Sequence, residues 1–121
     1  MEFNNGVLAG LSKEVARVKY PLPLAGRPIH IPIEQGESEL EFRYRAERIF
    51  HKIMQDYQAY NRVAIVSHGG LISQFIKAFL KQSNVSELRF ATGDTGIHLL
   101  EAKERLRVVR FLYKQEHLKE I

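Results

Sequence analysis

The chain has 121 residues, 45% of them hydrophobic and 26% charged, which is ordinary for a water-soluble globular protein, and its length favours one domain over residues 1–121. Because it contains no cysteine, disulfide scaffolds, thiolate catalysis and zinc sites built on sulfur are excluded. No apolar stretch is long enough to cross a bilayer and no signal-peptide pattern is present, so we predict no membrane partner and a cytoplasmic location.

The formal net charge is +4, from 18 Lys and Arg against 14 Asp and Glu, and it would help to attract an anionic partner. A phosphorylated metabolite and a nucleic acid both meet that description. In the most basic stretch, residues 43–48, the arginines are mixed with an acid, which is typical of a solvated helix face. We therefore expect no nucleic-acid partner.

The first predicted element is a short helix over Lys13–Val18. Ser12 can cap its beginning, and Pro21 would prevent it from continuing. The segment Tyr20–Gly36 then holds all four prolines of the chain and is predicted to be a long loop.

A long helix is predicted after this loop. Ser38, with Glu41 three residues later, forms the signature of a capping box and marks the beginning of the helix. Apolar residues then recur at helical spacing. The predicted buried face consists of Phe42, Ile49, Phe50, Ile53 and Tyr57.

The second half of the chain reads as a strand, a helix and a hairpin. Val63–Val66 is a short apolar, β-branched run of the kind that forms a strand buried in a parallel sheet, and a Gly69-Gly70 turn follows it. A second amphipathic helix is predicted from Leu71 to about Lys81. Gly96–Leu100 and Arg105–Phe111 resemble two strands joined by a polar turn, so the predicted class is α/β with an antiparallel hairpin.

The residues Val66-Ser67-His68-Gly69-Gly70 are the most informative of the chain. They place an imidazole at the carboxyl end of a predicted strand and directly before a helix, where open α/β sheets bind ligands. Free N–H groups at the beginning of that helix favour an anion such as phosphate. On spacing alone, a tight turn with His68 as a hydrogen-bonded rim residue is an equally good interpretation.

Other kinds of site find little support. Ser67 and His68 are neighbours that would point to opposite faces of a strand, which argues against a serine-hydrolase pair. No phosphate-binding loop of the type G-x-x-x-x-G-K-[ST] is present, and the histidines lack the short spacing of metal ligands. We predict no metal and no cofactor. The histidines are His30, His51, His68, His98 and His117.

Three blocks of sequence together resemble the histidine phosphatase superfamily, whose members are phosphoglycerate-mutase-like. They are Glu2–Leu11, Gly36-Glu37-Ser38 with Arg45 further along, and Val66–Gly70. The resemblance runs from Glu2 nearly to the C-terminus. It implies part of that family's three-layer α/β fold, with a parallel strand-turn-helix unit and a C-terminal antiparallel hairpin.

The resemblance also implies roles for single residues. In the family, a histidine near the N-terminus attacks phosphorus and becomes a phosphohistidine, which water or a second hydroxyl discharges. By resemblance, His68 is the second histidine that stabilises the phosphoryl group, with help from the Gly69 N–H, and Glu2 is the acid that protonates the leaving oxygen. The implied partner is a phosphorylated small molecule or inorganic phosphate. Ser38 and Arg45 match a family motif, but we interpret Ser38 as a cap and Arg45 as structural.

The sequence departs from the family at one decisive point. No histidine here is preceded by Arg and followed by Gly, so the signature triplet with the phosphate-accepting histidine is missing. We therefore expect a truncated domain, inactive alone, whose intact relatives hydrolyse phosphomonoesters. Hydrolysis is favoured over mutase chemistry because only a short stretch separates Gly10 from Gly36.

The missing segment would also supply the strand beside Val63–Val66. Its loss should leave apolar sheet edge uncovered, so we expect self-association into a homo-oligomer. Two alternatives stay open. One is a non-catalytic binding or regulatory module that self-associates through the exposed sheet, and the other is a chain whose missing half is supplied by a partner.

Overall fold

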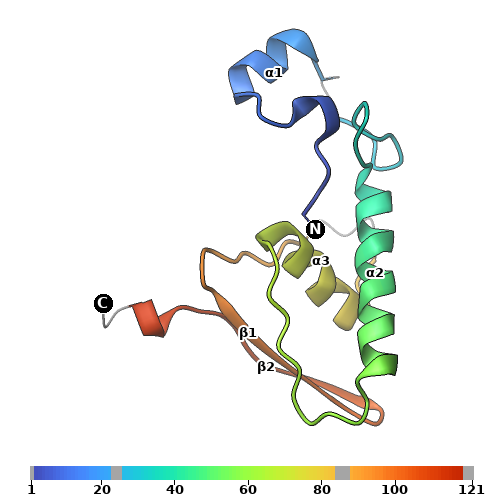
Figure 1. The fold of residues 1–121 in the computed structure, drawn as a ribbon, viewed down its shortest axis with the longest axis vertical. Coiled ribbons are helices and arrows are strands. Elements are labelled where there is room, and N and C mark those ends of the chain that lie inside the picture. The colour runs from blue at the N-terminus through green and yellow to red at the C-terminus, as the bar shows by residue number, and fades with distance from the viewer. Residues whose placement is uncertain (1, 23–25, 84–87, 119–121) are drawn as a thin grey trace.

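The computed structural model describes residues 2–22, 26–83 and 88–118. Figure 1 shows a long helix, α2, with the shorter α3 beside it and a β-hairpin next to α3, while α1 stands apart at the other end. In chain order the elements are η1 (Gly6–Leu8), α1 (Lys13–Lys19), α2 (Glu39–Asp56), α3 (Gly69–Phe79), β1 (Ile97–Lys103), β2 (Leu106–Lys114) and η2 (Glu116–Leu118).

Side-chain caps fix the beginnings of the first two α-helices, as the sequence predicts. The Ser12 hydroxyl accepts the Val15 N–H at 3.2 Å and begins α1. At α2 the Ser38 hydroxyl accepts the Glu41 N–H at 3.0 Å, and the Glu41 carboxylate accepts the Ser38 N–H at 3.1 Å. Both bonds of the predicted capping box are present, so each satisfies one backbone donor that the helix itself cannot satisfy.

The buried face of α2 is shorter than the sequence predicts. Phe42 and Phe50 are buried, but Tyr57 is the C-cap residue and lies 46% exposed, so the prediction was wrong there. Figure 1 shows α3 beside only part of the length of α2, so α3 does not cover Tyr57 at the end of that helix. Instead Arg43 is buried, and its guanidinium binds Glu47 and the backbone oxygen of Gln82.

Residues 63–66 do not form the predicted strand. They make no backbone hydrogen bond to another segment within the described ranges, and a strand exists only where such a ladder forms. Val66 is accordingly 97% exposed. The predicted helix after them is confirmed, but it begins at Gly69, so the two glycines form its first turn rather than a turn before it.

The predicted C-terminal hairpin is confirmed. β1 and β2 pair antiparallel from Lys103 opposite Leu106 to Ile97 opposite Lys114, with irregular register around Leu99. The α/β class with an antiparallel hairpin and a helix after residues 63–68 is thus confirmed. Among the described residues this hairpin is the whole of the sheet, and no parallel pair of strands occurs.

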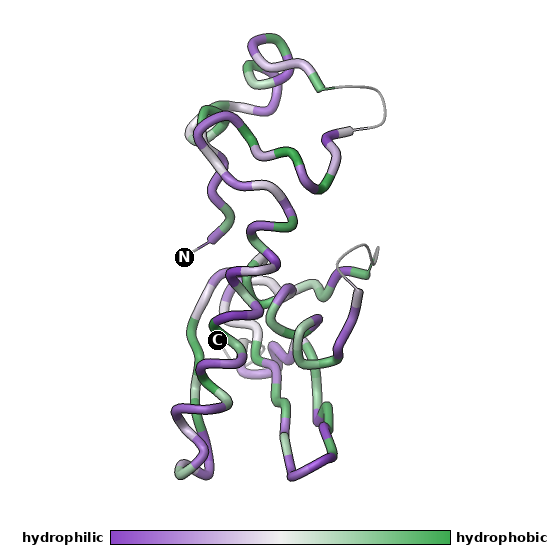
Figure 2. The backbone as a smooth tube through the Cα atoms, turned by 90° about the vertical axis from the view of Figure 1, so that its right-hand side faces the viewer, coloured by the Kyte–Doolittle hydropathy of each residue, from purple (hydrophilic) through white to green (hydrophobic). Residues whose placement is uncertain are grey.

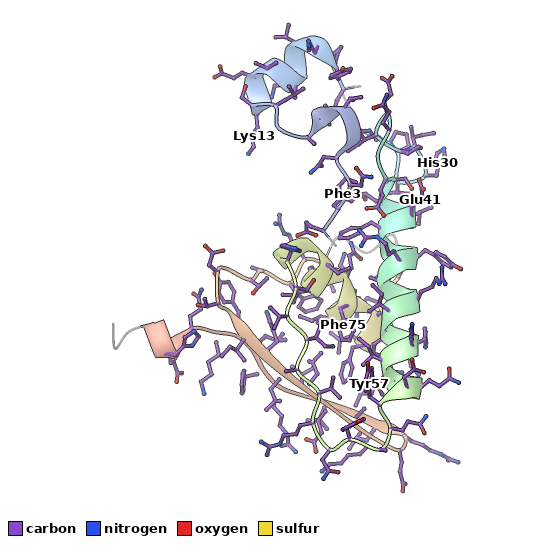
Figure 3. The ribbon with its side chains drawn as sticks, viewed as in Figure 1. Phe3, Lys13, His30, Glu41, Tyr57 and Phe75 are labelled. Atoms are coloured by element: carbon purple, nitrogen blue, oxygen red, sulfur yellow. The ribbon has the colours of Figure 1, made fainter. Side chains whose placement is uncertain are left out.

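Two small apolar clusters hold the elements together. The first joins α2 to α3 and includes Phe3 from the N-terminal segment. The second joins α2, the end of α3 and the hairpin, and Figure 3 shows Phe75 between α3 and α2. Figure 1 and Figure 2 agree that α1 and the loop before α2 lie away from α3 and the hairpin. The buried members are Phe42, Ala46 and Leu71 in the first cluster, and Phe50, Ala78 and Phe79 in the second.

Candidate functional site

His68 lies at the N-terminal end of α3. It is the N-cap residue, with φ −104° and ψ 157°, and its backbone oxygen accepts the Ile72 N–H that begins the helix. Its side chain makes no capping hydrogen bond, and the residue is exposed. The imidazole is therefore free to contact a ligand at the positive end of the helix dipole.

The Glu2 carboxylate reaches the same helix end from the other end of the chain. One oxygen accepts the Gly70 N–H at 2.8 Å and the other accepts the Phe3 N–H at 3.0 Å. A Cβ atom at position 70 would lie 2.6 Å from Oε1 of Glu2, so any other residue there would push the carboxylate away from this position. Two residues that the sequence singled out separately, Glu2 and His68, thus meet at the beginning of α3.

Gly69, which follows His68, supplies an open backbone donor. Its N–H has no hydrogen-bond partner among the residues that the structure describes, as expected for the first turn of a helix. Thr92 packs against it, and a Cβ at position 69 would lie 3.3 Å from the Thr92 methyl group. The open N–H, the helix dipole and the exposed imidazole together form an arrangement that can hold an anion.

An ion pair at the beginning of α2 fastens the segment that carries Glu2. Arg45 donates from Nε and Nη2 to the two carboxylate oxygens of Glu37, at 3.0 and 2.9 Å, and Nη2 also donates to the backbone oxygen of Glu2 at 3.0 Å. Glu37 in turn accepts the Asn4 N–H at 2.8 Å. The Phe3 ring packs edge-on against Phe42 at 5.2 Å, so apolar contact adds to these bonds.

This ion pair also makes stability depend on pH. The hydrogen bonds that the Glu37 carboxylate accepts from Arg45 and Asn4 hold its pKa below the ordinary value of 4.5, although partial burial acts the other way. A lowered pKa in the folded state means that the stabilisation is complete above pH 4.5 and is lost as the pH falls through the folded-state pKa. Glu37→Gln should therefore flatten the decline of the unfolding free energy below pH 4.5, as measured by urea titration at several pH values. The exposed carboxylate variant Glu14→Gln is the control. If the unfolding free energy declined equally steeply below pH 4.5 in Glu37→Gln and Glu14→Gln, Glu37 would not be the source of this pH dependence.

The sequence identified part of this arrangement and missed the rest. His68, Gly69 and Glu2 were singled out, and the structure brings them to one helix end. Ser38 is a cap, as interpreted, and Arg45 contacts Glu37 and the backbone of Glu2. The close approach at Gly70 and the role of Glu37 were missed, and the only signal for either was membership in the Gly36-Glu37-Ser38 and Gly69-Gly70 blocks.

Two negative findings apply to the described part of the chain. Its residues 2–22, 26–83 and 88–118 contain no cluster of three or more His, Asp or Glu side chains that could bind a metal. Within the same ranges, every helix is too short or too polar to traverse a lipid bilayer.

Comparison with protein-family models supports the family resemblance. The model of the histidine phosphatase superfamily (branch 1) matches residues 1–115. No curated protein matches the chain with significant similarity.

Proposed function

The chain belongs to the histidine phosphatase superfamily, and on that premise we propose that it is the phosphoryl-binding part of a phosphomonoester hydrolase. The observation that carries this proposal is the hydrogen bond between the Glu2 carboxylate and the Gly70 N–H. It brings the proposed acid to the helix end where His68 is the N-cap residue, although Glu2 and Gly70 are 68 residues apart in sequence. The ligand would be a phosphorylated small molecule or inorganic phosphate.

Each residue has a definite part in the proposed chemistry. A protonated His68 and the Gly69 N–H would hold the negative oxygens of the phosphoryl group, where the α3 dipole adds to their attraction. Glu2 would give its proton to the leaving oxygen as the phosphorus–oxygen ester bond breaks, and would later take a proton from the attacking water. The histidine that accepts the phosphoryl group is not among these 121 residues, because none is preceded by Arg and followed by Gly. We therefore propose that this polypeptide binds phosphate but does not turn over by itself.

Phosphate affinity is the direct test. We expect His68→Ala to weaken binding of inorganic phosphate about tenfold or more, since a charge-assisted hydrogen bond contributes roughly 1.5–3 kcal/mol. Isothermal titration calorimetry of the purified chain measures this. The matched control is His51→Ala, which removes an exposed histidine of α2 that pairs with Glu47. Equal affinities for wild type and His68→Ala would remove the basis for assigning phosphate binding to His68.

A second candidate function is supported by the exposed segment at residues 63–66. Val63, Ile65 and Val66 are 46%, 45% and 97% exposed, and their backbone forms no ladder within the described ranges. Such an exposed apolar segment without a hydrogen-bonded neighbour can pair with a strand of another chain. A non-catalytic regulatory module that self-associates here would sediment as a stable dimer and show no phosphate affinity, whereas the proposed hydrolase part binds phosphate whatever its oligomeric state.

A further inference from the structure

We propose that Arg45 is a positioning residue that, through Glu37, sets where the Glu2 carboxylate stands at the end of α3. This inference rests on the proposed function, since it concerns the acid of that site. Arg45 contacts the backbone oxygen of Glu2 and the carboxylate of Glu37. Its action passes through the segment Glu2 to Asn4.

Two anchors hold the segment from Glu2 to Asn4. Arg45 binds the backbone oxygen of Glu2 at 3.0 Å on one side of Phe3, and Glu37, which Arg45 orients through two bonds, accepts the Asn4 N–H at 2.8 Å on the other side. The planar guanidinium of Arg45 fixes the Glu37 carboxylate in one orientation because the contact is bidentate. The two anchors lie two residues apart and bracket Phe3.

The backbone of the same region supports this arrangement. The Glu37 N–H donates to the Asn4 oxygen at 2.9 Å, and the Val7 N–H donates to the Glu34 oxygen at 2.9 Å. A Cβ on Gly36 would lie 2.5 Å from the Asn4 oxygen, so glycine is required for the two stretches to approach. The N-terminal segment is thus fastened to the residues before α2, while its carboxylate ends on α3.

Arg45 on α2 therefore determines whether the Gly70 N–H at the beginning of α3 is bound by the Glu2 carboxylate. With the segment in place, the Glu2 carboxylate holds the Gly70 N–H at 2.8 Å and puts a negative charge where the phosphoryl group would bind. Without Arg45, Glu37 loses its orientation and Glu2 loses its backbone anchor. The carboxylate should then leave α3, which would free the Gly70 N–H and remove a like charge from the site.

Two measurements on the full chain test this. In the first, the amide proton resonance of Gly70 is compared by nuclear magnetic resonance in wild type and variants. Glu2→Gln shows where the Gly70 resonance lies when no carboxylate accepts its N–H. We expect Arg45→Ala to shift the Gly70 resonance most of the way to that position. Arg45→Lys keeps the positive charge without the bidentate contact and should give an intermediate shift, so it decides the question if Arg45→Ala does not fold. Arg48→Ala, an exposed arginine of the same helix, should leave the resonance unchanged.

In the second measurement, phosphate affinity should rise about threefold or more in Arg45→Ala, because the repelling carboxylate has left. Loss of a positive charge alone would lower anion affinity, so the sign separates positioning from simple electrostatics. In a chain that already carries Glu2→Gln, adding Arg45→Ala should not raise the phosphate affinity further. A Gly70 resonance that does not move in either Arg45→Ala or Arg45→Lys would overturn the proposal. So would an equal change in phosphate affinity when Arg45→Ala is made in wild type and in Glu2→Gln. Absence of phosphate binding in wild type would instead count against the proposed function, while the Gly70 comparison would still decide the role of Arg45.

Discussion

Purified alone, the chain should hydrolyse an aryl phosphate no faster than its own His68→Ala variant, and on the order of 10⁴-fold or more slower than an intact relative. Loss of the attacking residue of a covalent mechanism has an effect of this size. None of the five histidines here has the Arg before it and the Gly after it that mark the phosphate acceptor of the family. The measurement is product release under saturating substrate.

Adding the N-terminal segment of a relative that carries the Arg-His-Gly triplet should restore hydrolysis if the two pieces associate. The matched control is the same segment with the triplet histidine replaced by alanine, and His68→Ala in this chain should also abolish the restored rate. Hydrolysis by the chain alone that disappears in His68→Ala would falsify the missing-nucleophile argument, because another group here would then have to accept phosphate.

Local signals in the sequence predicted the elements well. Ser12, Ser38 and Glu41 fix helix beginnings through bonds between residues three apart, so the sequence alone contains the information. The hairpin was predictable for the same reason, because both strands and their turn are contiguous. The α2 and α3 helices were predictable from apolar spacing.

The features that depend on distant partners were predicted poorly. Residues 63–66 have the composition of a buried strand, but a strand needs a neighbour, and the described residues supply none. The burial of Arg43 depends on the backbone oxygen of Gln82, 39 residues away. At the candidate site, the sequence pointed to Glu2 and His68 one at a time, whereas their meeting at α3 depends on how Arg45 fastens the N-terminal segment.

The largest expected effect on stability follows Phe50→Ala. Phe50 is 1% exposed, and its ring packs edge-on against Phe75 at 5.3 Å and Phe79 at 6.3 Å, while the Arg107 guanidinium lies over it at 5.2 Å. Removing a buried phenylalanine ring leaves a cavity and costs about 3–5 kcal/mol. For a domain with about 5–15 kcal/mol in total, this is a large share of the unfolding free energy.

Urea unfolding followed by circular dichroism measures that cost. Tyr44→Ala is the matched control, since Tyr44 is an aromatic residue of the same helix that lies 66% exposed, and its removal should change the free energy by no more than about 0.5 kcal/mol. Equal costs for the two variants would mean that the second apolar cluster does not hold α2, α3 and the hairpin together. Because α2 carries Arg45 and His68 is the N-cap residue of α3, loosening this cluster should also weaken phosphate binding in the fraction that remains folded. Phe50 is not a residue of the proposed phosphate site, so a parallel loss of stability and affinity would show that the site depends on how the two helices pack.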